Sequence, residues 1–595
     1  MKKDIFKPLA FILFAGLFIF SFTSCIGDEE TTEDGVEIIT ATESETDTYS
    51  ASDINHYAFE VAPETKTLTI SNLTTGKNVY LAKVNTGEST IAAKYQRTIT
   101  NSTGASRAAL ADTTELNDVQ PPETQFKHFH APKIDLESVK TAARSARVAS
   151  TTVPSPVMQK TYTEGTSTRD IWVDINVNMN QYGKKTAKLY AAGDNCYVWC
   201  IESDFTKQGK TSSDIQTVAT KFKNSFESFY PIITNVFGNE SNNLIDSTAQ
   251  VSTLKAAATL PMSENSDTGE KINIVIYDIG SDYNATNQCG VLGYFYAKDY
   301  FTPIEGVSSP IAYSNKGKYF YIDAIYAADD ETQNSSISTL AHEFQHMIDY
   351  GVKDIEQGIT PDTAYNEMLS MLCEDMMSSQ LGLTDSTNVK AERLPYFNTS
   401  YFLSGIREYR NDGYAALSYS TSYGFGSWLC RQYGGAKLVK EMSTNNSVDS
   451  NSIVDAVNTV TSKSYNFDEL FQQFLVACTN GGATSDYTHN QAAAQTLTYS
   501  TTYSYPMTAI NLWDNAYKYP TDSNKFIVQG QKSAAYDSSA TTYSGPFLFN
   551  LNYSLALRPK YGMTLYKVGT TNSDTLTLTF SDQGAADVYM YVIIQ

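Results

Sequence analysis

Apolar residues recur at helical spacing in three stretches in the middle of the chain. These stretches span residues 213–236, 335–350 and about 367–380. Apolar side chains that return every three or four positions line one face of a helix. The pattern therefore predicts three amphipathic helices, and Ser335 or Ser336 is suited to cap the second one.

Shorter runs of β-branched and aromatic residues predict strands upstream of the second helix. They lie at residues 171–175, 196–201 and 271–277. Two further runs, 311–314 and 319–322, flank Asn-Lys-Gly-Lys, which is typical of a β-hairpin. Strands and helices in this mixture predict an α+β domain, which we expect to cover residues 155–485.

Alternating apolar and polar positions at both ends of the chain predict all-β domains on either side of the α+β domain. A small β domain is expected at residues 51–95 and a β-sandwich-like domain at residues 486–595. Residues 96–154 are rich in Ser, Thr, Ala and Arg and show little periodicity. They are interpreted as a linker.

The first 24 residues have the features of a signal peptide. Lys2 and Lys3 precede an apolar run at residues 8–22, which is too short to span a membrane comfortably. The run ends in Phe-Thr-Ser-Cys, which resembles the bacterial lipoprotein processing box with Cys25 as the lipidated residue. This predicts an extracytoplasmic protein held to an outer membrane or cell surface by lipid, with residues 25–50 as an acidic tether. An ordinary signal peptide that ends near a cysteine is the alternative.

Composition restricts the partners. The formal net charge of −22 argues against nucleic acid as a partner, because phosphate binding needs a basic surface. The 41 tyrosines suit wide β surfaces, and they would equally suit a carbohydrate binder or an adhesin.

Cys196 and Cys200 are expected in one strand, about 13 Å apart and too far apart to form a disulfide bond. Cys373 and Cys430 are expected as buried thiols.

A metal-binding motif occupies the second predicted helix, His342-Glu343-Phe344-Gln345-His346. The two histidines are four residues apart, so both imidazoles leave the same side of the helix and can share one zinc ion. Glu343 is next to the first ligand and can reach a water on the metal. It is therefore the candidate general base, because zinc makes that water acidic.

A catalytic zinc ion needs a third protein ligand, and Glu367 is the candidate. It lies at the start of the third helix, after a loop marked by Gly351, Gly358 and Pro361 that can turn the chain back. A solvated helix residue is the alternative interpretation. The pair His128 and His130 could also bind metal, but surface or linker histidines are expected there.

These motifs together resemble the hyicolysin family of glutamate-zincin metallopeptidases. His-Glu-Phe-Gln-His is followed by Asn-Glu-x-Leu-Ser, and further upstream motifs occur in the family's order: Phe229-Tyr230-Pro231-Ile232, Phe237-Gly238, Gly293-Tyr294-Phe295, Lys298-Asp299, Ser314-Asn315 and Tyr321-Ile322-Asp323. The resemblance covers about residues 155–480. It implies a zincin-like domain with a β-rich lobe, whose edge strand holds the substrate, and a helical lobe. The predicted hairpin at 311–322 is the candidate edge strand, although an ordinary hairpin is as good an interpretation.

Two positions depart from the pattern of related glutamate zincins. An Asp one turn after the third ligand orients a histidine there, whereas this chain has Met371. Glu374 is on the same helix face as Glu367 and could take that role, with Asp375 as the other choice. For the donor to the oxyanion, Tyr423 resembles a tyrosine of related zincins, and Tyr419 is the second candidate.

The sequence favours a zinc endopeptidase with one catalytic Zn²⁺ that acts on proteins or peptides. The alternative is a surface adhesin or binding protein on an inactive metallopeptidase scaffold. The presence of His342, Glu343, His346 and Glu367 favours the enzyme. An aminopeptidase would need an acidic anchor for the substrate amine, and Glu305 and Glu331 are weakly placed for that role.

Overall fold

The structure of the chain is a computed structural model. It describes residues 37–41, 47–50, 57–105, 114–116, 129–149, 159–176, 181–248, 253–256, 258–281, 283, 290–304, 309–384, 388–479, 496–498, 503–513, 516–518, 542–551, 553–581 and 584–595. The predicted signal peptide, Cys25 and His128 lie outside these residues. Within the described part, none of the helices combines the length and the apolar character that a membrane span requires.

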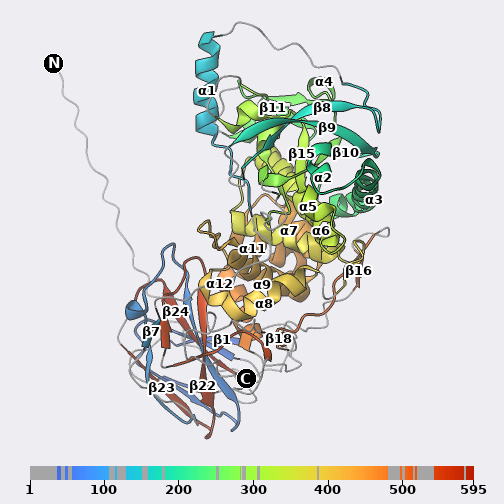
Figure 1. Ribbon diagram of the computed structural model, residues 1–595. Coiled ribbons are helices and arrows are strands. Elements are labelled where there is room, and N and C mark those ends of the chain that lie inside the picture. Colours follow the sequence, from blue (N-terminus) through green and yellow to red (C-terminus); the bar gives the residue numbers. More distant parts are fainter. Residues whose placement is uncertain are drawn as a thin grey trace, which may run out of the picture. The chain divides into compact units, whose positions relative to one another are not determined.

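A six-stranded sheet forms the β-rich part of the α+β region, with the strand order β14-β15-β13-β10-β9-β8. Figure 1 labels β8, β9, β10 and β15 of this sheet. The strands are Gly293–Phe295, Lys318–Asp323, Ile272–Tyr277, Cys196–Cys200, Tyr182–Ala192 and Thr168–Asp174, in that order. Strands β10, β13 and β15 run parallel, and the outer strands are antiparallel to their neighbours. The α+β class and the strands predicted from residues 171–277 are thus confirmed.

The predicted hairpin at 311–322 is wrong. Residues Pro310–Tyr313 form a short 3₁₀ helix, η5, and only the second half of the predicted hairpin is a strand, β15. β15 is an inner strand between β13 and β14. The edge of the sheet is therefore β14, whose three residues are too few to give a clear alternating pattern.

Alternation along the inner strands divides the sheet into two apolar faces. Phe320 and Ile322 of β15 belong to the larger core, whereas Tyr319 and Tyr321 belong to a separate aromatic cluster on the other face. The helices α3 (Ser212–Phe237) and α6 (Gln333–Asp349) pack on the first face, where Phe226 of α3 contacts the rings of Phe320 and Phe344.

Helices make up most of the chain between β15 and residue 479. They are α5 Ala324–Ala327, α6, a π-helical turn η6 Tyr350–Gln357, α7 Thr363–Met377, α8 Val389–Ser400, η7 Tyr401–Leu403, α9 Ala415–Tyr433, α10 Ala436–Thr444, α11 Asp449–Thr461 and α12 Phe467–Thr479. The three helices predicted from periodicity are confirmed as α3, α6 and α7. The cap predicted at Ser335 or Ser336 is wrong, because α6 begins at Gln333, where Asp329 accepts from the N–H groups of Glu331 and Thr332.

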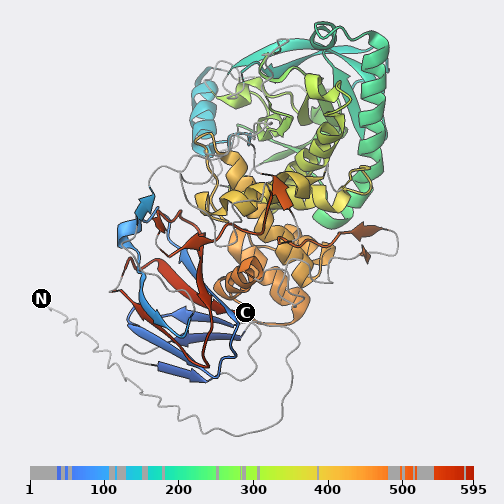
Figure 2. The ribbon, with the colours of Figure 1, turned by 60° about the horizontal axis from the view of Figure 1, so that its bottom comes forward.

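Two β-sheets combine strands from both ends of the chain, so that blue and red strands interleave in Figures 1 and 2. One has the order β1-β3-β24-β5-β22-β20 and the other β2-β4-β23-β6. Their strands are Glu37–Ala41, Tyr57–Val61, Val588–Ile594, Asn78–Asn85, Gly562–Thr570 and Phe549–Asn550, then Asp47–Ser50, Thr67–Ser71, Leu576–Phe580 and Ile99–Thr103. The expectation of two separate β domains is wrong, because each C-terminal strand β23 and β24 lies between two N-terminal strands.

The predicted tether and linker also contain regular structure. β1 and β2 lie in the predicted tether, and β6, β7 (Thr114–Leu116) and α1 (Leu136–Ala149) lie in the predicted linker. The remaining elements are α2 Glu202–Thr206, β11 Asn243–Ile245, η2 Leu254–Ala256, β12 Thr259–Pro261, α4 Met262–Asn265, η3 Ile279–Ser281, η4 Ala297–Tyr300, η1 Ala93–Tyr95, β16 Thr496–Thr498, β17 Ser504–Pro506, β18 Ala516–Lys518, β19 Thr542–Ser544 and β21 Tyr553–Leu555.

The described cysteines agree with the sequence prediction. Cys196 and Cys200 share β10, and both are buried free thiols. Cys373 and Cys430 are likewise buried and free.

Candidate metal centre and cleft

Helix α6 supplies three side chains of the candidate site, His342, Glu343 and His346. The four-residue spacing brings the two imidazole rings to 4.7 Å between centroids. All three residues are buried. The helix is fixed by its apolar face, in which Phe344 packs against Tyr230 of α3 with nearly parallel rings.

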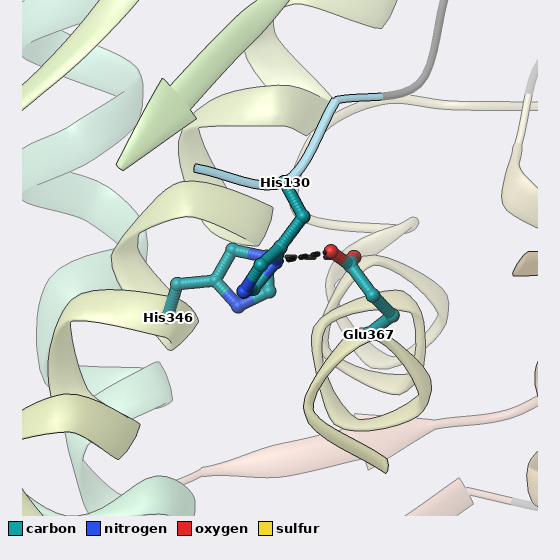
Figure 3. A group of neighbouring side chains, drawn as sticks. All are labelled: His130, His346 and Glu367. Carbon is teal, nitrogen blue, oxygen red and sulfur yellow. Dashed lines mark hydrogen bonds and ion pairs between the residues drawn. The ribbon is translucent and has the colours of Figure 1, made fainter. Parts of the chain in front are cut away.

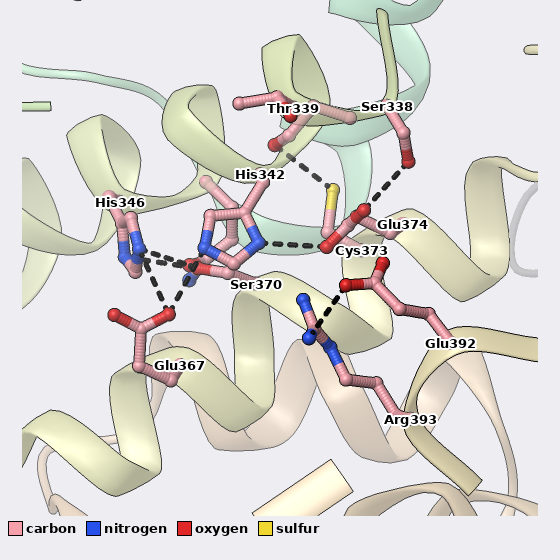
Figure 4. Close-up of polar contacts among 12 residues, drawn as sticks. Ser338, Thr339, His342, His346, Glu367, Ser370, Cys373, Glu374, Glu392 and Arg393 are labelled. Carbon is pink, nitrogen blue, oxygen red and sulfur yellow. Dashed lines mark hydrogen bonds and ion pairs between the residues drawn. The ribbon is translucent and has the colours of Figure 1, made fainter. Parts of the chain in front are cut away.

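Helix α7 brings Glu367 to the two histidines (Figure 4). Its Oε2 atom lies 3.0 Å from His342 Nε2 and 3.4 Å from His346 Nε2. Ligand atoms about 2.0–2.1 Å from a zinc ion lie about 3.3 Å apart in a tetrahedron. The two distances from Glu367 Oε2 to the imidazole nitrogens therefore fit the edges of a tetrahedral metal site.

The other ring nitrogen of each histidine has a partner of its own. His342 Nδ1 lies 2.8 Å from Glu374 Oε1, and His346 Nδ1 lies 2.9 Å from Asn366 Oδ1. Both partners accept hydrogen bonds, so each Nδ1 carries a proton, and each Nε2 is directed at Glu367 Oε2. The Nε2 atoms pair with the carboxylate, and a divalent cation can take the place of the protons between them, because two imidazole nitrogens and one carboxylate oxygen are a donor set that suits Zn²⁺.

Further polar groups hold these partners in place. Ser338 Oγ donates to Glu374 Oε2 at 2.7 Å, and Ser370 Oγ lies 3.0 Å from His346 Nδ1. The sequence suggested Glu374 beside a histidine, but it did not single out Asn366 or Ser370. Both lie in the Asn-Glu-x-Leu-Ser motif, one helical turn apart. That spacing is the sequence feature from which they could have been predicted as partners of His346.

Burial and charge shift the pKa values of the two glutamates in opposite directions. Burial raises the pKa of Glu343, and the nearby His342 and His346 oppose the shift. Burial would also raise the pKa of Glu367, but His346 and hydrogen bonds to the surrounding imidazoles hold it well below its usual range. Glu343 therefore has the character of a base that is ready to accept a proton, whereas Glu367 stays ionised.

A third histidine, His130, reaches the same cluster from the segment before α1 (Figure 3). Its Nδ1 lies 2.6 Å from Glu367 Oε1, and its ring centroid lies 5.2 Å from that of His346. The ligand atoms of His130, His346 and Glu367 all lie within 4.8 Å of one another. The prediction of a surface or linker histidine is wrong for His130.

The two tyrosines considered as oxyanion donors have different surroundings. The Tyr423 hydroxyl donates to Asp375 Oδ2 at 2.9 Å, and Arg431 forms a two-pronged ion pair with the same buried carboxylate. Tyr423 and Asp375 thus join α9 to α7, away from the metal ligands. Tyr419, one turn earlier, lies with its ring parallel to that of His342 at 6.3 Å and donates to Glu367.

Comparison with known proteins places this geometry in a family. Residues 188–499, more than half of the chain, match the family described as Peptidase M30. The chain belongs to the M30 peptidase family. The resemblance to the hyicolysin family is thereby confirmed.

One curated relative is the neutral metalloprotease ShpI of Staphylococcus hyicus. It is 24% identical over 331 residues, which are 53% of this chain and 64% of the relative. The chain thus spans slightly less than two thirds of the relative's length. His130 and α1 precede the part that matches the M30 family.

Two hollows of this M30 family member meet at Glu343, which lines both of them. The larger one, of about 360 Å³, also contains His346, Phe295, Tyr350 and Asp354 in its wall. The smaller one, of about 60 Å³, is lined by His342, Gly293, Glu374 and Tyr419 among others. Both hollows follow the edge strand β14, whose Phe295 N–H donates to Glu343.

Proposed function

We propose that this M30 family member is a zinc-dependent endopeptidase of extracytoplasmic proteins or peptides. The observation that carries the proposal is the convergence of His342 Nε2, His346 Nε2 and Glu367 Oε2 beside the carboxylate of Glu343. The relative named as a metalloprotease supports it. Glu305 lies outside the described residues and Glu331 is exposed, so neither supports an aminopeptidase.

The position of Glu343 supports cleavage within a chain. Glu343 lines both hollows, and together they offer room for substrate residues before and after the scissile bond. The edge strand β14 can hold an extended peptide, because a strand at the edge of a sheet offers unpaired backbone groups.

His342, His346 and Glu367 would hold the zinc ion, which supplies Lewis acidity for the attacking water and the substrate carbonyl. Glu343 takes the proton of the attacking water and later passes it to the leaving amine. Glu374 and Asn366 keep the two imidazoles oriented through Nδ1. Tyr419 donates to the oxyanion, in place of Tyr423, because its hydroxyl already reaches Glu367.

Replacement of the general base tests the proposed function. Glu343→Gln should keep bound zinc, because Glu343 is not a ligand, and should lower the rate of casein cleavage by at least about 10³-fold. Glu331→Gln, at an exposed glutamate two residues before α6, is the matched control and should behave like the parent. Mass spectra of the products should show internal cleavage. A parent that binds zinc but cleaves neither casein nor unstructured peptides would favour the adhesin hypothesis.

We propose that lipid attached to Cys25 anchors the protein to a membrane. The support is the sequence alone, namely the basic and apolar leader that ends in Phe-Thr-Ser-Cys. Cells fed a palmitate analogue should label the parent and leave Cys25→Ser unlabelled. Equal labelling of both proteins would contradict the proposal.

A further inference from the structure

A short segment at residues 129–134 crosses the cleft of the M30 peptidase. It has no regular secondary structure and comes directly before α1. Phe129 contributes to the walls of both hollows, and its ring lies edge-on to Tyr294 of β14, with 6.4 Å between centroids. The segment therefore lies along the strand that we expect to hold the substrate.

His130 of this segment is directed at the metal centre. Its Nδ1 atom lies 2.6 Å from Glu367 Oε1. The second carboxylate oxygen, Oε2, faces His342 and His346. The backbone of His130 is hydrogen-bonded to the Tyr409 hydroxyl, which fixes where the ring enters. The side chain is 17% exposed, so most of it is within the cleft.

Three protein ligands and one open position are the rule for catalytic zinc, whereas four protein ligands are typical of structural zinc. His342, His346 and Glu367 already supply three ligands. The ligand atoms of His130, His346 and Glu367 lie within 4.8 Å of one another, so this imidazole can reach a metal ion that His346 and Glu367 hold. Occupied by His130, that position cannot take the water that hydrolysis requires.

A second contact holds the segment in the larger hollow. Lys133 Nζ donates to the carbonyl oxygen of Pro361 at 2.5 Å, in the loop that leads into α7. Asp354 lines the same hollow, so the wall around Lys133 is acidic. The segment is thus fastened at two points, at the metal ligands by His130 and at the loop by Lys133.

We propose that residues 129–134 are a built-in inhibitor, in which His130 is a fourth metal ligand that closes the active site. This inference rests on the proposed metallopeptidase function. Cleavage of substrate then requires the segment to leave the cleft, either by displacement or by proteolysis. Because the segment has no helix or strand of its own and belongs to no sheet, it can leave the cleft without breaking a strand pair.

The open position can be probed without measuring activity. We would replace zinc by Co²⁺ in the full chain, record the visible absorption spectrum and titrate acetohydroxamate, a small ligand for an open metal position. The variants are His130→Ala and Lys133→Ala, and His128→Ala is the control at a histidine two positions away in the sequence. Lys133→Ala changes an exposed residue, so it provides a second test of the segment if His130→Ala folds poorly.

We expect His130→Ala to change the Co²⁺ spectrum and to bind acetohydroxamate at least about tenfold more tightly, because a site closed for nine tenths of the time loses tenfold in apparent affinity. Lys133→Ala should shift the affinity in the same direction but less. Casein cleavage should rise in parallel, and His128→Ala should match the parent.

Two results would overturn the inference while leaving the proposed function intact: equal spectra and equal acetohydroxamate affinity in the parent and His130→Ala, or an effect of His128→Ala instead. A parent chain that binds neither Zn²⁺ nor Co²⁺ would overturn both. A loss of casein cleavage in His130→Ala with retained metal would identify His130 as part of the active machinery, and would likewise reject the inhibitor role.

Discussion

At the scale of single residues, the candidate site consists of two imidazoles directed at one carboxylate oxygen. Glu374 and Asn366 fix which nitrogen of each histidine carries a proton, and this leaves His342 Nε2 and His346 Nε2 free to bind metal. The orientation does not depend on the ion being present, because it comes from side chains of α7. The site is therefore pre-organised, which lowers the cost of ordering its ligands when metal binds.

Tyr419 and Tyr423 differ by one helical turn, and a pair of matched variants should separate their roles. Tyr419→Phe removes a hydroxyl beside Glu367, and we expect kcat to fall by about 10²-fold with zinc content unchanged. Tyr423→Phe removes the hydrogen bond to Asp375, and we expect a loss of about 1–3 kcal/mol in the free energy of unfolding with little change in kcat. Peptide cleavage and chemical denaturation measure the two effects.

The two outcomes control for each other, since each variant removes only one oxygen. A fall in kcat confined to Tyr423→Phe would restore the first assignment made from the sequence. A fall in stability without loss of activity in Tyr419→Phe would show that Tyr419 is only a structural residue.

The residues that could be predicted from the sequence are those whose partners are fixed by local geometry. His342 and His346 are set by helical spacing, and Glu367 follows in the next long helix. Tyr419 and Tyr423 lie on nearly the same face of α9, so spacing alone cannot choose between them. His130 lies 237 positions from Glu367, and no local pattern connects the two.

At the scale of elements, the prediction of a hairpin at 311–322 was wrong because the Asn-Lys-Gly-Lys turn was interpreted from local sequence alone. The contacts of Asn315 with distant residues were not considered. The Asn315 side chain exchanges hydrogen bonds with the backbone N–H and carbonyl groups of Trp172 in β8. Its own N–H donates to Asp299. Asn315 therefore ties distant parts of the sheet together, and the chain before it goes into η5 rather than into a second strand.

The edge strand β14 lies unusually close to its neighbours, and Gly293 makes this approach feasible. A Cβ atom at Gly293 would lie 2.7 Å from the carbonyl oxygen of Tyr321 and 2.8 Å from Thr339 Cγ2 of α6. Gly293→Ala should therefore displace β14 and the Phe295 N–H that donates to Glu343. We expect kcat/KM for peptides to fall by about 10²-fold, because small displacements of reacting groups have effects of this size.

Gly183→Ala provides the control in the same sheet, since the added methyl group would meet only the Ile175 side chain, at 3.1 Å. Both variants should bind zinc as the parent does, as metal analysis would show. Unchanged peptide kinetics in Gly293→Ala would contradict a role for β14 in holding the substrate.

At the scale of the whole molecule, the two ends of the chain form one pair of sheets. β24 pairs with β3 and β5, which lie more than 500 residues earlier. Alternation predicts that such segments are strands, but it contains no information about which strand is the partner, because every half-buried strand has the same period. The strands at the chain ends were therefore predictable from the sequence, whereas the pairing of N-terminal with C-terminal strands was not.

Lys83 tests the energetics of this β unit separately from the metal centre. It lies on β5, is 2% exposed, and its Nζ lies 5.1 Å from the centre of the Tyr566 ring. Burial lowers the pKa of Lys83 from 10.5 to about 8. Between these two values the unfolded chain binds more protons than the folded chain, so stability increases as pH rises from about 8 to 10.5.

Replacing Lys83 by Met removes the cost of the buried ammonium group. We expect Lys83→Met to raise the free energy of unfolding at pH 7 by up to about 3 kcal/mol, less the part that the Tyr566 ring already offsets. The gain should shrink as pH rises from about 8 to 10.5 and should be lost above 10.5, where the parent's lysine is neutral in both states. Lys567→Met, at a partly exposed lysine of the adjacent strand, should change stability by less than about 0.5 kcal/mol. Guanidinium unfolding across this pH range measures the difference, and a gain that stays constant with pH would show that packing rather than charge explains it. Chelation of zinc should leave the gain unchanged, because Lys83 belongs to the sheets formed by the chain ends and the metal ligands belong to α6 and α7.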